Sequence, residues 1–132
     1  MEINYKTNEM PTAAAVIAVY ESAGLPRPTG DAERIARMYA GSNLVVTAWH
    51  GGKLVGVSRA ITDNAWVCYL SDLAVMKDYQ AYGIGRKLID LNREALGEEV
   101  MLLLLSVPGA MEYYPKIGMQ AMTSGFIYPR VR

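Results

Sequence analysis

The chain has 132 residues, of which 52% are hydrophobic and 20% are charged, a composition typical of a globular domain and unlike that of a disordered segment. We therefore expect a single domain over residues 1–132. Its 13 basic and 13 acidic side chains give a formal net charge of zero, which argues against a dedicated nucleic-acid-binding protein.

Cys68 is the only cysteine, so the chain can form neither an internal disulfide nor a thiolate metal cluster. It lies in an apolar run, which favours a buried, inert thiol over a reactive one. The N-terminus lacks the pattern of a signal peptide, and no apolar run approaches the roughly 20 residues needed to span a membrane. We expect a cytoplasmic protein with no membrane partner and no bound metal.

The first third of the chain predicts a short edge strand followed by two helices. Residues 3–6 have the character of a strand, and the alanine-rich residues 12–22 have helical periodicity. Thr29 or Asp31 can cap a second helix over residues 32–39.

The middle of the chain predicts three antiparallel strands in succession. Residues 43–49 and 53–61 are rich in β-forming residues, and Gly51-Gly52 between them tolerates the positive φ angles of a hairpin turn. A second turn precedes a long strand over residues 65–75. The three strands form a predicted meander.

The remaining residues predict a helix, a strand, a short helix and two final strands. The ranges are 84–96, 100–105, 108–117, 119–122 and 125–128. The predicted order is therefore β-α-α-β-β-β-α-β-α-β-β, an α/β fold in which a mixed sheet carries helices on both sides.

A glycine-punctuated turn, Gln80-Ala81-Tyr82-Gly83-Ile84-Gly85-Arg86-Lys87-Leu88, joins the long strand to the next helix. Glycines let backbone N–H groups approach an anion, and the helix adds unpaired N–H groups and its positive dipole end. The spacing fits neither a dinucleotide-binding turn, which needs a small residue at Leu88, nor a P-loop, which needs a hydroxyl there. A tight turn that binds no ligand is the alternative.

The spacing Q-x-x-G-x-G in this turn resembles the acetyl-CoA pyrophosphate loop of the GNAT superfamily of N-acetyltransferases, [QR]-x-x-G-x-[GA]. A second segment, Ala110 to Met119, is similar to the late GNAT pattern A-x-x-F-Y-x-K-x-G-F, with Tyr113-Tyr114 at the family's F-Y. The layout of the family covers about residues 1–130. The resemblance implies a GNAT fold and an acetyl-CoA-dependent N-acetyltransferase that needs no metal.

The resemblance also implies which residues hold acetyl-CoA. The backbone of the strand before the loop would contact the pantetheine arm, and the loop itself would hold the pyrophosphate. In this sequence these residues are Leu73, Ala74 and Val75 for the arm, and Gln80, Ala81, Tyr82, Gly83, Ile84, Gly85, Arg86 and Lys87 for the pyrophosphate.

Two catalytic roles follow from the same resemblance. Tyr114 aligns with the tyrosine that protonates the departing CoA thiolate, although Pro115 directly after it disfavours helical geometry at Tyr114. Asp72 is the nearest candidate for the base that deprotonates the amine, with Asp63 and Glu112 as other candidates. A hydrogen-bonded structural carboxylate is an equally good interpretation of Asp72.

The predicted reaction is direct attack of a primary amine, on a small molecule or a peptide, on the thioester in a ternary complex. One alternative is a GNAT-fold module that binds acyl-CoA without turnover, and another is a structural protein without a cofactor. Arg27 and Arg59 could attract a carboxylate-bearing acceptor, but solvated side chains are the simpler expectation. The Met-, Leu- and Tyr-rich C-terminal part is compatible with a homodimer formed through strand contacts.

Overall fold

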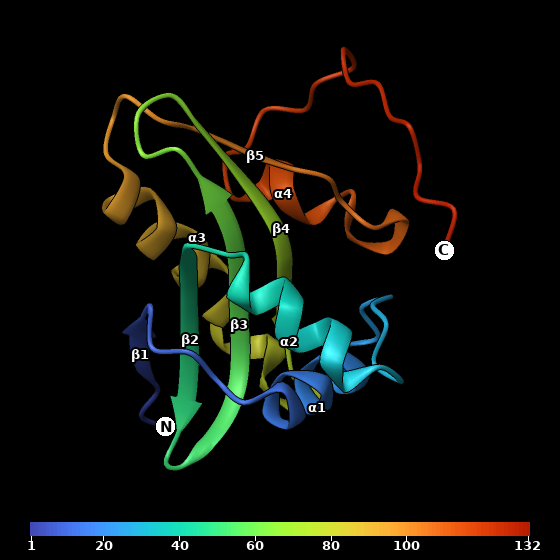
Figure 1. Ribbon diagram of the computed structural model, residues 1–132. Helices are drawn as coiled ribbons and strands as arrows, with labels where there is room; N and C mark the ends of the chain where they lie inside the picture. Colours follow the sequence, from blue (N-terminus) through green and yellow to red (C-terminus); the bar gives the residue numbers. More distant parts are fainter.

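The computed structural model describes residues 1–132 and places helices on both faces of a five-stranded mixed sheet (Figure 1). The strand order is β1-β2-β3-β4-β5, antiparallel except for the parallel pair β4 and β5. The elements are β1 (Asn4–Thr7), α1 (Ala13–Ala23), α2 (Ala32–Ala40), β2 (Leu44–His50), β3 (Lys53–Thr62), β4 (Val67–Val75), the 3₁₀ helix η1 (Lys77–Tyr82), α3 (Ile84–Leu96), β5 (Met101–Leu104), the 3₁₀ helix η2 (Pro108–Ala110) and α4 (Tyr113–Lys116). The α/β fold class predicted from the sequence is confirmed.

The ends of the first two helices are set by the capping residues that the sequence offers. The Thr12 side chain accepts a hydrogen bond from the N–H of Ala15 at 3.1 Å, and Gly24 ends α1 in the left-handed conformation with φ 73°. Asp31 caps α2 by accepting from the N–H of Arg34 at 3.0 Å. Of the two caps considered for α2, the structure uses Asp31.

The core has two parts, one on each face of the sheet. On one face, α1 and α2 bury Val16, Val19 and Ile35 against β3 and β4. On the other face, α3 buries Ile84 and Leu88 against the strands. The apolar side chains of the strands are thus covered from both sides, and the predicted meander of β2, β3 and β4 is confirmed.

An irregularity in β4 lies at the point where this strand separates from β5. In the β3–β4 register Arg59 faces Asp72 but the neighbouring Ala60 faces Leu70, so Ser71 is an extra residue in β4. The parallel pairing of β4 with β5 ends at Leu70 and Leu104. Beyond this point β4 continues to Val75 while β5 leaves it, and a gap opens between the two strands.

The C-terminal part of the chain differs from the prediction. The helix predicted over residues 108–117 is divided into η2 and the four-residue α4, and neither predicted strand, 119–122 or 125–128, forms. A strand is stable only when a neighbouring strand takes up its backbone hydrogen bonds, and no strand of the chain pairs with these residues. The β5 strand is partly exposed. No helix has the length and apolar character needed to cross a membrane.

Candidate active site

The gap between β4 and β5 contains a cavity of about 190 Å³. Its lining combines residues that are distant in the sequence, among them Arg27 and Ser71, the predicted arm-binding residues Leu73, Ala74 and Val75, and Gln80 and Tyr114. The structure therefore brings the predicted proton donor to the same cavity as the strand predicted to contact the pantetheine arm.

The backbone of β4 turns polar groups toward this gap. The N–H of Met76 donates to the carbonyl of Val55 at 2.8 Å, so the backbone groups of Met76 face β3. Because these directions alternate along a strand, those of Leu73 and Val75 face away from β3, toward the gap. The Val75 carbonyl accepts from the Gln80 side chain at 2.9 Å. The N–H of Val75 is a donor positioned at the gap.

The first turn of α3 carries unpaired N–H groups at the other end of the gap. Gly83 adopts φ 74°, a conformation that favours glycine, and it gives the helix no side-chain cap. The first helical bond is donated by Lys87 to the carbonyl of Gly83 at 3.1 Å. The N–H groups of the preceding three residues, Ile84, Gly85 and Arg86, therefore have no acceptor within the helix.

The side chains around this turn divide into a buried anchor and an exposed polar surface. Ile84 is buried in the core and fixes the start of α3. The exposed side chains are those of Ala81, Tyr82, Arg86 and Lys87. Two cationic side chains thus stand at a helix N-terminus with free donors, an arrangement suited to an anion such as a diphosphate.

Tyr114 lies half-buried in the wall of the cavity. Pro115 falls within the first turn of α4, where its missing N–H costs no helical hydrogen bond. The carbonyl of Tyr114 accepts from Ile117 and Met119, which closes the turn after the helix. Burial, and secondarily the neighbouring Tyr113, raise the pKa of the Tyr114 hydroxyl above its ordinary value. Tyr114 therefore remains a proton donor at neutral pH.

Tyr113 has a position that the sequence did not indicate. Its hydroxyl points to the first turn of α3, where a Cβ at Gly85 would lie only 3.1 Å from it. Its ring meets that of Tyr114 edge-on, with centroids 5.2 Å apart. Burial raises the pKa of Tyr113, and the charge of Arg86 opposes this shift. Gly85 thus makes room for Tyr113 as well as for an approaching anion.

Asp72 is buried at the centre of a polar cluster. Its carboxylate accepts hydrogen bonds from the Nε of Arg27, the Nε of Arg59 and the hydroxyl of Tyr20, each at 2.6 Å. Burial alone would raise the pKa of Asp72, but the hydrogen bond and charge of Arg59, followed by Tyr20 and Arg27, hold it below its ordinary value. This carboxylate is an ionised, fully engaged group, which favours the structural role that the sequence left open.

The partners of Asp72 extend the cluster across α1, α2 and the sheet. The hydroxyls of Tyr20 and Tyr39 are 2.6 Å apart, and burial is the main cause that raises the pKa of each. Arg59 is only 8% exposed and Arg27 also donates to the carbonyl of Ser71 at 2.8 Å. The expectation of two solvated arginines was wrong. No local sequence signal joins residues that lie this far apart in the chain.

The other two candidate bases lie elsewhere. Asp63 accepts the N–H groups of Ala65, Trp66 and Val67 at 2.8 to 3.0 Å and so organises the β3–β4 turn. Those three hydrogen bonds lower the pKa of Asp63. Glu112 is exposed before α4. Neither residue lines the cavity.

Comparisons with known proteins agree on one family. A family model described as an acetyltransferase (GNAT) domain matches residues 25–128. An uncharacterised N-acetyltransferase of Pyropia yezoensis is 33% identical over 86 residues, 59% of this chain and 48% of that protein. A GCN5-related chloroplastic N-acetyltransferase of Arabidopsis thaliana is 30% identical over 84 residues, 59% of this chain and 33% of that protein. The chain thus matches half or less of the length of these relatives.

The fold has a solved counterpart over nearly its whole length. A protein from methicillin-resistant Staphylococcus aureus, described as a probable acetyltransferase, superposes with a TM-score of 0.84. The two sequences are 23% identical, and the match covers 98% of this chain and 99% of the other. At this level of identity the likeness supports a shared fold and nothing beyond it.

Proposed function

Because this chain belongs to the acetyltransferase (GNAT) domain family, we propose that it is an N-acetyltransferase that moves an acetyl group from acetyl-CoA to a primary amine. The observation that carries this proposal is the gap between β4 and β5, with the uncapped start of α3 at one end and Tyr114 in its wall. The single cysteine, Cys68, is buried and without a disulfide, which suits a reducing compartment such as the cytoplasm.

The residues around the gap fit the chemical parts of acetyl-CoA. The N–H groups of Ile84, Gly85 and Arg86, with the cationic side chains of Arg86 and Lys87, suit the diphosphate. The backbone groups of Leu73 and the N–H of Val75 suit the amides of the pantetheine arm, which can pair with them as an added strand would. When bound, acetyl-CoA supplies an acyl group that is activated as a thioester.

Two groups of the chain are placed to assist direct attack by an amine. The N–H of Val75 can donate a hydrogen bond to the acyl carbonyl oxygen, where negative charge develops. The Tyr114 hydroxyl can give its proton to the departing thiolate sulfur. The acceptor amine must lose a proton before it attacks. A base role for Asp72 stays a prediction. The ion pairs of its carboxylate with Arg27 and Arg59 argue for a structural role instead.

Thermal unfolding with and without acetyl-CoA tests the binding part of this proposal. Acetyl-CoA at about 100 times its Kd stabilises by about 2.7 kcal/mol and should raise the melting temperature by several degrees. We expect this rise to disappear in Gly85→Glu, whose side chain displaces Tyr113 and brings a negative charge to the anion site. Gly52→Glu is the matched control, since the hairpin turn has open space around Gly52. No rise in the parent protein would refute cofactor binding.

Release of free thiol in the presence of a panel of amines tests turnover. A protein that acetyl-CoA stabilises but that turns over no amine would be the non-catalytic acyl-CoA-binding module. A thiol signal that depends on the amine, together with acetylated product identified by mass spectrometry, would support the transferase.

A further inference from the structure

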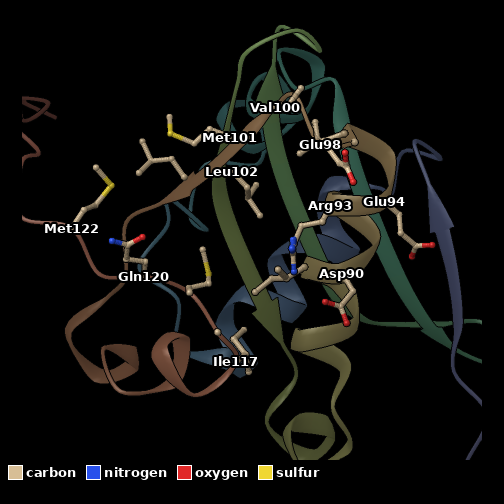
Figure 2. Close-up of a pocket in the computed structure, with 16 residues that line it drawn as sticks. Asp90, Arg93, Glu94, Glu98, Val100, Met101, Leu102, Ile117, Gln120 and Met122 are labelled. Atoms are coloured by element: carbon tan, nitrogen blue, oxygen red, sulfur yellow. The ribbon is translucent and has the colours of Figure 1, made fainter.

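A second hollow lies on the opposite side of β5 from the active-site gap. It has a volume of about 1110 Å³ and lies between α3, β5 and the segment after α4 (Figure 2). Apolar side chains such as those of Val100, Leu102 and Ile117 line it, and Met101 stands at its edge. We call it the α3–β5 groove. The strand β5 pairs with β4 along one edge only, so its other edge has free backbone donors and acceptors.

The C-terminal tail, residues 119–132, exposes apolar side chains that could fill such a groove. Phe126, Ile127, Tyr128 and Val131 are 99%, 72%, 101% and 97% exposed. The start of the tail borders the groove at Met119 and Met122, but the rest leaves it (Figure 1). Large apolar side chains that gather on a surface usually mark an interaction site.

Beyond Met122 the tail does not line the groove of its own chain. The carbonyl of Arg132 accepts a hydrogen bond from the Arg34 side chain of α2 at 3.0 Å. Helix α2 lies on the opposite face of the sheet from α3, which forms one wall of the groove (Figure 1). The end of the tail is thus held away from its own groove, and the side chains of Phe126 and Tyr128 stay exposed.

Charge and area both match the tail to the groove. The charged side chains that line the groove are those of Asp90, Arg93, Glu94 and Glu98, with a net charge of −2, and the tail beyond Gly125 carries two basic side chains, Arg130 and Arg132, and no acidic one. Aromatic side chains bury about 150–250 Å² each, so two tails with Phe126 and Tyr128 bury about 600–1,000 Å². With an equal area from the groove walls, the total reaches the range of a stable interface, about 1,200–2,000 Å².

We propose that the α3–β5 groove of one copy receives the tail of a second copy. Residues 125–128 add as a strand to the free edge of β5, and Phe126 and Tyr128 enter the groove. The exchange is reciprocal, so each copy donates one tail and one groove and the dimer closes with twofold symmetry. The strand that the sequence predicts over residues 125–128 would then have a partner strand in the neighbouring copy.

Light scattering after size exclusion tests this dimer. We expect the parent protein to have the mass of two chains, and the double variant Phe126→Glu/Tyr128→Glu to have the mass of one. The control Met10→Glu changes an exposed apolar side chain before α1 and should stay dimeric. Melting curves check that each variant folds. A monomeric parent protein, or a double variant that remains dimeric, would overturn the proposal.

Cross-linking separates exchange between copies from a tail that folds back on its own groove. A chain with Met101→Cys is mixed with a chain of different tag length that carries Ile127→Cys, and both are treated with a bifunctional maleimide. We expect a cross-linked species of two different chains, and none in the parent protein, whose Cys68 is buried. In a chain with both substitutions, a product of monomer mass would show that the tail covers its own groove and would overturn the proposal. Absence of any cross-link would also overturn it.

Discussion

Arg59 and Asp72 face each other across β3 and β4, with the guanidinium Nε 2.6 Å from the carboxylate Oδ2. Neither side chain is more than 9% exposed, and Asp72 has a second ion pair with Arg27 at 2.6 Å. The pair lies beside Ser71, the extra residue after which β4 and β5 diverge. We infer that the charges hold the irregular part of β4 in place and so keep the gap open.

Asp72→Asn should therefore lower stability strongly. Removal of one member of a buried ion pair costs about 3–5 kcal/mol, because the remaining charge is left without a partner. Urea denaturation measures this loss, and Glu21→Gln on the exposed surface of α1 should change stability by less than about 0.5 kcal/mol. If Asp72→Asn kept its stability but lost turnover in acetylation assays, Asp72 would be the base that the sequence suggested.

The pH dependence of stability provides an independent test of the same carboxylate. The pKa of Asp72 is depressed in the folded protein, so its contribution to stability is complete above the unfolded pKa of about 3.9 and is lost as pH falls through the lower folded pKa. We expect the free energy of unfolding to fall below about pH 4 in the parent protein. The fall should be shallower in Asp72→Asn, which has no such proton to bind. Parallel pH profiles would contradict this account.

Gly83→Ala should separate backbone strain from loss of binding. A side chain at φ 74° costs about 1–2 kcal/mol, and a Cβ there would point into the open space in front of α3. Gly51→Ala is a control with similar strain, φ 61°, in the β2–β3 hairpin. We expect both variants to lose comparable stability in urea, and only Gly83→Ala to lose acetyl-CoA affinity by calorimetry. If Gly83→Ala bound acetyl-CoA as tightly as the parent protein does, the diphosphate would have to bind elsewhere.

The contact between Gly85 and Tyr113 predicts a measurable coupling. In Gly85→Ala the new methyl group lies 3.1 Å from the Tyr113 hydroxyl oxygen, whereas the next atom of that ring is 3.8 Å away, an ordinary contact. Crowding of this kind costs about 1 kcal/mol. We expect Gly85→Ala to be more favourable by about that amount in a Tyr113→Phe background, measured as a double-mutant cycle of unfolding free energies. A coupling near zero would mean that Tyr113 moves aside freely.

Local signals explain which parts of this structure the sequence could predict. Thr12, Asp31 and Gly24 act on residues within a few positions of themselves, and the Gly51-Gly52 turn sets its own hairpin. The start of α3 was predictable for the same reason, since Gly83 has an intrinsic preference for positive φ.

Contacts between distant residues explain what the sequence could not predict. Asp72 meets Arg27 and Tyr20, which lie 45 and 52 positions away, and only the folded sheet brings them together. Likewise, β-forming residues in the tail indicate that a strand is favourable, but the pairing partner decides whether it forms. In a single chain no partner lies beside residues 125–128, so the predicted strand is absent.

Tyr114→Phe tests the proton donor without changing the shape of the cavity. If the hydroxyl protonates the leaving thiolate, kcat should fall by about 10²–10⁴-fold while the Kd for acetyl-CoA stays nearly constant. Because burial raises the pKa of Tyr114, the donor stays protonated through neutral pH, and the kcat of the parent protein should decline only above about pH 10. Tyr5→Phe in β1, far from the cavity, is the control. A kcat for Tyr114→Phe within a few-fold of the parent value would assign the proton transfer to water and leave Tyr114 as part of the cavity wall.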